Sequence, residues 1–268
     1  MPVAQVNNIN IYYEIHGEGE PLVLVAGLGS DSQSWQFVIN DLSNHFQTII
    51  FDNRGVGRSD SPSPPYSIED MATDLLKLLD YLNIERMHIL GHSMGGFIAQ
   101  EFAIKYPERV RKLILESTAP ISSKRNNFLF NNLYKAWKSG MDMELWLQQF
   151  LFWIFSTKTM ENEKFISSYV KYTLDYPYPQ SIEGFHGQIK AIEEFDARNK
   201  LHKIQSETLI MIGEEDILIK PKEAELLYQG ISRSSYPTYI EKAAHSIHSE
   251  ASKSFTNSVL GFLYKYVR

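Results

Sequence analysis

The chain has 268 residues, of which 43% are hydrophobic and 22% charged, an ordinary composition for one large globular domain with a sizeable core. A net charge of −6 without a basic stripe argues against a nucleic-acid-binding protein, and the lack of cysteine excludes disulfide and thiol chemistry and favours a cytoplasmic protein. We expect no secretory signal, because residues 1–5 lack a basic start and an apolar run. We expect no membrane span, because the longest apolar stretch, 145–155, is about half as long as a bilayer requires.

Apolar runs and amphipathic runs alternate along most of the chain and predict strands and helices in turn. The predicted strands are residues 9–15, 22–25, 48–51, 86–90, 112–115, 208–212 and 235–240. The predicted helices are residues 35–43, 68–82, 94–106, 221–228 and 249–266. After an antiparallel start, strands separated by helices require a parallel sheet with right-handed crossovers. The sequence therefore predicts an α/β fold in which helices flank a mostly parallel central sheet.

The segment 120–200 interrupts this alternation. It holds 16 of the 34 aromatic residues, and its pattern is largely helical with a break at Pro177 and Pro179. Aromatic side chains at this density fit a helical insert that packs on itself, and they also fit an apolar roof above a site. We predict a helical cap of residues 120–200, inserted into a core formed by residues 1–119 and 201–268.

Residues 89–96, Ile-Leu-Gly-His-Ser-Met-Gly-Gly, place Ser93 between two glycines directly after an apolar run. In a Gly-x-Ser-x-Gly elbow, a strand turns sharply into a helix and pushes the serine hydroxyl out of the sheet edge. Side chains at positions 91 and 95 would collide with the neighbouring strand and helix. The predicted strand and helix on either side, the helix ended by Pro107, supply this context. Ser93 is therefore the candidate nucleophile.

An acid and a histidine follow later strands of the predicted sheet. Asp216 comes after the strand that ends at Gly213, and His245 comes after the strand that ends near Ile240. This order of serine, acid and histidine resembles the α/β-hydrolase superfamily over nearly the whole chain. The other motifs that carry the resemblance are Ala-Gly-Leu-Gly at 26–29, Phe-Asp-Asn-Arg-Gly-Val-Gly-Arg-Ser at 51–59, Gly-Glu-Glu-Asp at 213–216 and Ala-His-Ser at 244–246. The resemblance implies the α/β-hydrolase fold and a catalytic triad of Ser93, Asp216 and His245.

Backbone N–H groups are expected to form the oxyanion hole. We assign Leu28 and Met94 to it, the second at the start of a helix whose dipole adds to the effect. Relatives often carry His-Gly in the loop at 26–29, and Ala26 stands here in place of that histidine. Because backbone amides do the work, we expect the hole to persist with a different bracing of the loop.

The base and the acid each have a rival. His248 lies three residues after His245, but the Ala-His-Ser setting favours His245. Glu116 ends the strand after the elbow helix, where some relatives keep their acid, usually as an aspartate. This difference favours Asp216 as the partner of the histidine.

Several other polar residues receive a structural interpretation. We expect Glu214 and Glu215 to be solvated and His92 to be a packing residue. The turn from Gly55 to Gly57 lacks both the GxGxxG pattern and the following lysine of a phosphate-binding loop. Since no group of histidines and acids has the spacing of metal ligands, we predict neither a metal nor another cofactor.

These residues predict a serine hydrolase that cleaves carboxylic esters, including lactones and thioesters, through an acyl-enzyme. The turn Asn-Arg-Gly-Val-Gly-Arg-Ser at 53–59 and the short chain look most like small esterases and enol-lactonases. Serine at position 93 argues against the dehalogenases and epoxide hydrolases of this fold. Hydrolysis of a C–C bond in a β-diketone, acyl transfer and a slow ligand-binding receptor remain as alternatives. We expect a small ester-like substrate with an apolar part, and Trp146, Phe152 and Trp153 are candidate substrate-binding residues.

Overall fold

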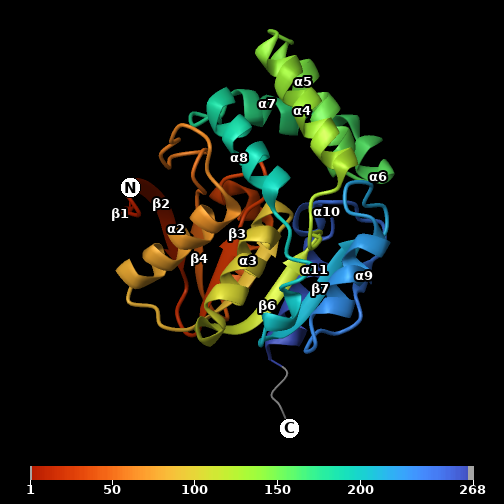
Figure 1. Ribbon diagram of the computed structural model, residues 1–268. Helices are drawn as coiled ribbons and strands as arrows, with labels where there is room; N and C mark the ends of the chain where they lie inside the picture. Colours follow the sequence, from red (N-terminus) through yellow and green to blue (C-terminus); the bar gives the residue numbers. More distant parts are fainter. Residues whose placement is uncertain (1, 265–268) are drawn as a thin grey trace.

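The computed structural model describes residues 2–264, and a single eight-stranded sheet runs through its centre (Figure 1). The strand order across the sheet is β1-β2-β4-β3-β5-β6-β7-β8. The strands are β1 (Val3–Val6), β2 (Ile9–His16), β3 (Pro21–Val25), β4 (Gln47–Phe51), β5 (Met87–His92), β6 (Val110–Glu116), β7 (Glu207–Gly213) and β8 (Thr238–Ile240). Strand β2 is antiparallel to β1 and β4, and all later neighbours are parallel. The predicted α/β fold with a mostly parallel sheet is confirmed.

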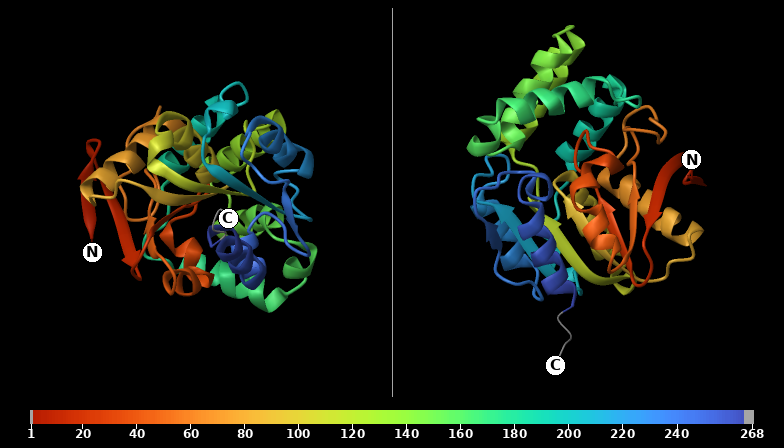
Figure 2. Two further views of the ribbon diagram at one scale, coloured as in Figure 1. Left: turned by 90° about the horizontal axis from the view of Figure 1, so that it is seen from below. Right: turned by 180° about the vertical axis from the view of Figure 1, so that it is seen from behind.

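Helices cover both faces of the sheet (Figure 2). On one face, α2 (Ile68–Tyr81), α3 (Met94–Lys105) and α9 (Pro221–Gly230) share an apolar cluster with the strands. On the other face, η1 (Ser32–Phe37), α1 (Ile39–Ser43) and α11 (Ser252–Leu263) share a second cluster. Strand β5 is buried along its whole length, as expected for a central strand covered on both sides.

Five helices form a layer beyond the edge of the sheet at which the parallel strands end (Figures 1 and 2). They are α4 (Lys124–Lys138), α5 (Met143–Ile154), α6 (Thr157–Met160), α7 (Glu163–Leu174) and α8 (Ile182–Glu194), and we call residues 124–194 the cap. The chain enters and leaves the cap side by side, since the N–H of Ala197 donates to the carbonyl of Pro120 at 2.8 Å. This pairing supports the predicted division into a core and an inserted cap, which stays a prediction.

Two predicted helices are broken. The helix expected at 35–43 is divided into η1 and α1, because Val38 has a non-helical backbone with φ −129° and ψ −14°. The helix expected at 249–266 is α10 (Ile247–Glu250) and α11, separated by Ala251 at φ −130° and ψ 45°. Residues 265 and 266 of that prediction lie outside the described residues.

Strand β1 was not among the predicted elements, although the Asn-Asn pair after it is typical of a hairpin turn. Asn7 and Asn8 have φ values of 49° and 61°, the backbone of a tight hairpin turn that asparagine tolerates. Val3 and Gln5 are exposed whereas Ala4 and Val6 are buried, so the strand alternates like a half-covered edge strand. A four-residue strand at the chain end is too short for this alternation to be decisive.

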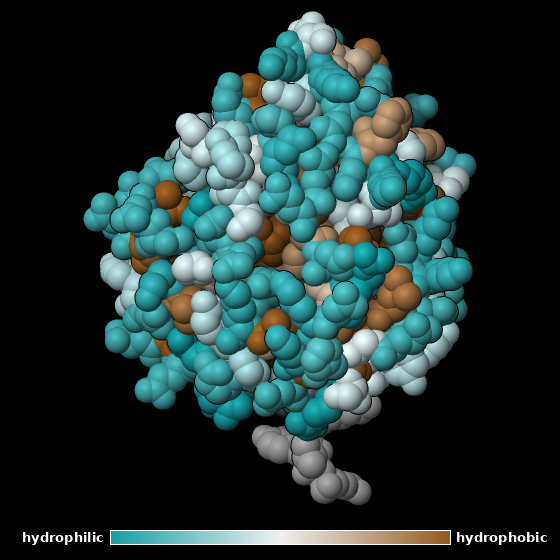
Figure 3. Space-filling view, viewed as in Figure 1, coloured by the Kyte–Doolittle hydropathy of each residue, from teal (hydrophilic) through white to brown (hydrophobic). Residues whose placement is uncertain are grey.

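The surface is mainly polar on the face that Figure 3 shows, where hydrophobic side chains gather in small separate groups. Across residues 2–264 we find no helix with the length and apolar character needed to cross a membrane.

Candidate active site

Ser93 occupies the sharp turn between β5 and α3. Its backbone has φ 54° and ψ −117°, which an L-residue adopts only under strain, and its N–H donates to the carbonyl of Glu116 at 3.0 Å. A Cβ at Gly91 would collide with the backbone of Gly95, and one at Gly95 would collide with the carbonyl of Val25. The two glycines therefore let strand, turn and helix approach closely enough to hold Ser93 at the sheet edge.

The structure brings Ser93, His245 and Asp216 into one hydrogen-bonded row. The Ser93 hydroxyl lies 2.9 Å from Nε2 of His245, and Nδ1 of the same ring lies 2.9 Å from Oδ2 of Asp216. The other oxygen of Asp216 accepts from the N–H groups of Leu218 and Ile219 at 2.8 and 2.9 Å. Because both histidine and aspartate are almost fully buried, these bonds fix which ring nitrogen faces the serine.

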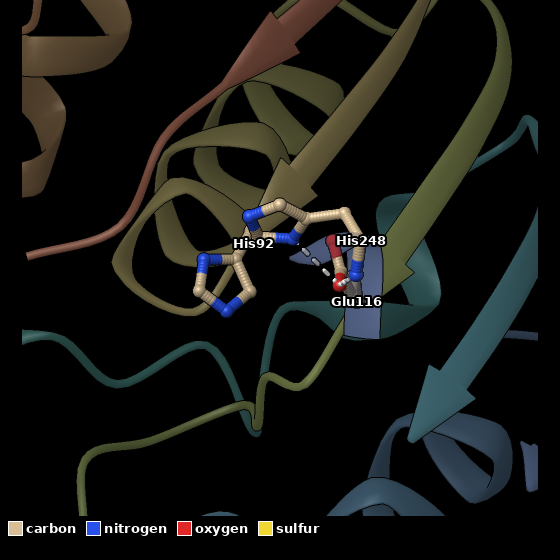
Figure 4. A group of neighbouring side chains, drawn as sticks. All are labelled: His92, Glu116 and His248. Atoms are coloured by element: carbon tan, nitrogen blue, oxygen red, sulfur yellow. Dashed lines mark hydrogen bonds and ion pairs between the residues drawn. The ribbon is translucent and has the colours of Figure 1, made fainter. Parts of the chain in front are cut away.

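The rival residues form a separate pair. Nδ1 of His248 and its backbone N–H both donate to Oε1 of Glu116, at 2.9 and 3.0 Å, as Figure 4 shows for the two side chains. Oε2 of Glu116 is buried without a hydrogen-bond partner. His248 therefore faces Glu116, while His245 faces Ser93.

His92 links the two pairs. Its Nε2–H donates to the backbone carbonyl of His245 at 2.9 Å, and its ring packs 5.0 Å from that of His245 and 4.8 Å from that of His248. Burial, and after it the neighbouring charges of His248 and His245, lower the pKa of His92 well below its usual range. A neutral His92 thus supports the backbone of His245, which is more than the packing role that we expected.

His92, Glu116 and His248 also form a group, within residues 2–264, whose side chains could hold a metal ion. One ligand atom from each lies within 4.8 Å of the others. The three residues are far apart in sequence, so no spacing in the chain could have revealed their approach. Nε2 of His92 and Nδ1 of His248 are engaged in hydrogen bonds, whereas Oε2 of Glu116 has no hydrogen-bond partner within residues 2–264.

Met94 follows Ser93 in the chain, and Leu28 lines the same cavity as Ser93. Met94 is the first residue of α3, where an N–H has no acceptor inside its own helix. Leu28 lies in a tight turn closed by a bond from the N–H of Ser30 to the carbonyl of Gly27. One N–H group thus begins α3 and the other lies in a loop, and both residues are close to the serine. The oxyanion hole stays a prediction.

A cap residue braces the loop that carries Leu28. Oε1 of Gln188 accepts from the N–H of Gly29 at 3.1 Å and from the side chain of Gln180 at 3.0 Å. Nε2 of Gln188 donates to the carbonyl of Arg54 at 2.9 Å, and the side chain is fully buried. An amide from α8 thus braces the loop that contains Ala26.

The cap also holds the loop that carries His245. The carbonyl of Ile154, the last residue of α5, accepts from the N–H of His245 at 3.0 Å. The carboxylate of Glu250 accepts from the N–H of Ala244 at 2.8 Å and from both the N–H and the hydroxyl of Ser156 at 2.7 Å. Glu250 therefore joins the histidine loop to the start of α6.

A cavity of about 280 Å³ lies between the cap and the sheet edge, and Ser93, His92, His245 and His248 line part of its wall. Trp146 lines it as well. Phe152 and Trp153 are not among its lining residues, and Phe152 is 58% exposed. Helix α5 is apolar around most of its circumference, and the face that carries Trp146, Leu147 and Leu151 is the one that turns inward.

The remaining predicted positions lie outside this cavity. Glu214 is exposed as expected, whereas Glu215 accepts from the N–H of Thr157 at 2.9 Å and so binds the cap. Gly57 has φ 61° beside the carboxylate of Asp52, which fits a structural turn. A wider groove of about 720 Å³ includes Glu207 and Thr208, where β7 begins, at the edge of the sheet opposite to the serine.

Comparison with protein families agrees with this geometry. The family defined by the alpha/beta hydrolase fold matches residues 20–252, which is most of the chain. The chain belongs to the α/β-hydrolase family. Ser93, His245 and Asp216, which hydrogen bonds join in this structure, are the three residues that the resemblance in the sequence named.

Individual relatives of this α/β hydrolase cover nearly all of it. A protein of Azorhizobium caulinodans, provisionally named carbamate hydrolase RutD, is 30% identical over 98% of both chains. The enol-lactonase from Burkholderia xenovorans LB400 is 28% identical, with a TM-score of 0.89 over 98% of this chain and 100% of the other. An esterase from Exiguobacterium antarcticum is 26% identical, with a TM-score of 0.86 over 97% and 98%. All three names describe hydrolases.

Proposed function

We propose that this α/β hydrolase cleaves carboxylic esters, including lactones and thioesters, through an acyl-enzyme on Ser93. One observation carries the proposal: a single imidazole lies 2.9 Å from the Ser93 hydroxyl and 2.9 Å from the carboxylate of Asp216. A serine hydroxyl becomes a useful nucleophile when a neighbouring imidazole takes its proton, and the carboxylate keeps that imidazole in the required tautomer.

The reaction follows from these positions. As Oγ of Ser93 bonds to the substrate carbonyl carbon, its proton passes to Nε2 of His245. The imidazolium, stabilised by Asp216, then gives that proton to the leaving alcohol or thiol as the ester bond breaks. Water attacks the acyl-enzyme by the same route, its proton going to His245 and then to Ser93, which releases the acid.

The developing negative charge is assigned to the N–H groups of Leu28 and Met94. Removing one such donor from an enzyme commonly costs about 3 kcal/mol of transition-state stabilisation. The start of α3 adds the positive end of a helix dipole at Met94. The brace from Gln188 to Gly29 supports this assignment, because it restricts the backbone next to Leu28.

The cavity supports a substrate of modest size with an apolar part. Its volume is about 280 Å³, and aromatic side chains of the cap, Trp146 among them, form one wall. The names of the relatives add carbamates and enol lactones to the candidate substrates. Each presents a carbonyl carbon bonded to a heteroatom that can leave.

Labelling and turnover together test the proposal. A fluorophosphonate should modify Ser93, identified by mass spectrometry of the peptide, and p-nitrophenyl esters of short acids should be hydrolysed. Ser93→Ala should lose both properties. Ser139→Ala, at an exposed position on the cap, is the control and should keep both. A wild-type protein that neither reacts with the label nor hydrolyses any ester, lactone or thioester would refute the proposal.

A further inference from the structure

The charged side chains around the cavity bear on which substrates it can bind. No lysine or arginine lines the cavity within residues 2–264, and Asp31 is its one carboxylate. The cavity has an apolar wall, formed by Phe130, Trp137, Trp146, Leu147, Phe150 and Phe185 from three cap helices. It also has a polar wall, formed by Asp31, Gln33, Ser34, Tyr176, Tyr178 and Gln180.

Asp31 is built into the polar wall. One carboxylate oxygen accepts from the N–H of Gln33 at 2.9 Å, and the other accepts from the hydroxyl of Tyr176, which lies between α7 and α8 of the cap. Burial, and after it the charge of Asp52, raise the pKa of the Asp31 carboxyl. A further negative charge placed beside Asp31 would meet the same unfavourable surroundings.

The nearby cation is already paired. Arg58 lies 3.0 Å from the carboxylate of Asp52 and 3.6 Å from that of Glu14, and its guanidinium is stacked 3.6 Å from the ring centre of Tyr12. One cation thus faces three carboxyl groups, counting Asp31. No positive charge is left over in this cluster for a substrate carboxylate.

The histidines at the serine end do not supply that charge either. The pKa of His92 lies well below its usual range, so its ring is neutral. His245 and His248 each face a protein carboxylate, Asp216 and Glu116. A carboxylate buried in this cavity would lose its hydration without gaining a partner of opposite charge.

We infer that the site selects uncharged substrates and that Asp31 excludes substrates with a carboxylate on the acyl or the alcohol side. This inference rests on the proposed function and narrows it: neutral esters and lactones are accepted, and half-esters of dicarboxylic acids and lactones that carry an acid group are rejected. The polar wall leaves amides and hydroxyls to contact neutral polar groups of the substrate.

Matched pairs of esters test the inference. On the acyl side, p-nitrophenyl pentanoate is compared with mono-p-nitrophenyl glutarate, which ends in a carboxylate. On the alcohol side, 3-methylphenyl butyrate is compared with 3-(butyryloxy)benzoate. We expect kcat/KM to be at least tenfold higher for the neutral member of each pair, a difference that corresponds to about 1.4 kcal/mol. Equal or faster hydrolysis of the charged members would overturn the inference and leave the proposed function intact.

Two variants separate a local effect of Asp31 from the net charge of the protein. Asp31→Asn keeps an oxygen that can accept from the N–H of Gln33 and should reduce the preference at least threefold. Asp41→Asn removes the same charge at an exposed position of α1 and should leave the preference unchanged. If Asp31→Asn leaves the ratio at its wild-type value, Asp31 does not set the specificity.

Binding measurements test the preference for uncharged substrates separately from the proposed ester hydrolysis. Calorimetry measures the affinity of wild-type protein for the N-phenyl amides of pentanoic acid and of glutaric acid, which are stable analogues of the first pair. We expect tighter binding of the neutral amide even if every ester were inert, an outcome that would refute only the proposed function. Tighter binding of the charged amide, or no binding of either, would refute the inference.

Discussion

Replacing Gln188 with leucine tests whether the cap takes part in catalysis. The Gln188→Leu variant removes three hydrogen bonds from a side chain that has no exposed surface. The N–H of Gly29 and the carbonyl of Arg54 lose this partner, whereas Gln180 keeps its second bond to the carbonyl of Gly55. Arg54 is buried, and a buried polar group that loses its partner costs about 1–3 kcal/mol. Gly29 is exposed, so its N–H can bond to water instead, and the free energy of unfolding should fall by about 1–3 kcal/mol.

The same variant should also slow the reaction. The N–H of Leu28 is assigned to the oxyanion hole, and loss of one such donor costs about 100-fold in kcat at the lower end. Because Gln188→Leu only loosens the loop, we expect a loss of about 10- to 100-fold in kcat with little change in KM. Urea unfolding and steady-state ester hydrolysis measure the two effects.

Gln148→Leu is the matched control. Gln148 is exposed on the cap and donates only to Glu144, at 3.3 Å, so stability should change by less than about 0.5 kcal/mol. If Gln188→Leu unfolded at the wild-type urea concentration and kept the wild-type kcat, the argument that the cap braces the oxyanion loop would be wrong.

The other predictions concern the triad and the apolar wall. Ser93→Ala should lower kcat by about 10⁴-fold or more without lowering the melting temperature, and a variant with a tenth of wild-type activity would contradict the serine mechanism. His245→Ala should inactivate the enzyme, whereas His248→Ala should keep most activity per folded molecule. His248→Ala should lower the free energy of unfolding by about 3 kcal/mol, because the buried carboxylate of Glu116 loses its partner. Asp216→Asn should be severe and Glu116→Gln mild in kcat; the reverse order at either pair would reassign that role. For p-nitrophenyl esters from acetate upwards, kcat/KM should rise by up to about fourfold per methylene until the cavity is full, and a flat profile would contradict an apolar acyl site.

The sequence was most informative where chemistry depends on short local motifs. Ser93 could be predicted because the flanking glycines, the strand and the helix all specify one turn. Asp216 and His245 could be predicted because the carboxyl ends of parallel strands meet at one edge of the sheet. The resemblance to a known family added the order of the three residues.

Other parts of the site left no such signal. Trp146 and Phe152 lie on the same apolar helix, and periodicity alone could not tell which of its faces would turn inward. Gln188 acts through one amide group and Ile154 through its backbone carbonyl, and neither has a motif that marks a distant partner. The apolar pattern of 35–43 is helical throughout and gives no sign of the non-helical backbone at Val38.

Ile154, Ser156 and Gln188 of the cap form hydrogen bonds with the core. These bonds limit which caps could be exchanged between relatives. A chimaera that received another cap would retain every residue of the triad and its own sheet. It would still lack the acceptor for the N–H of His245, the two bonds from Ser156 to Glu250 and the amide that holds Gly29, unless the donor cap supplied them. A replacement cap would have to reproduce these contacts and the bond from the N–H of Thr157 to Glu215, whatever the length of the insert.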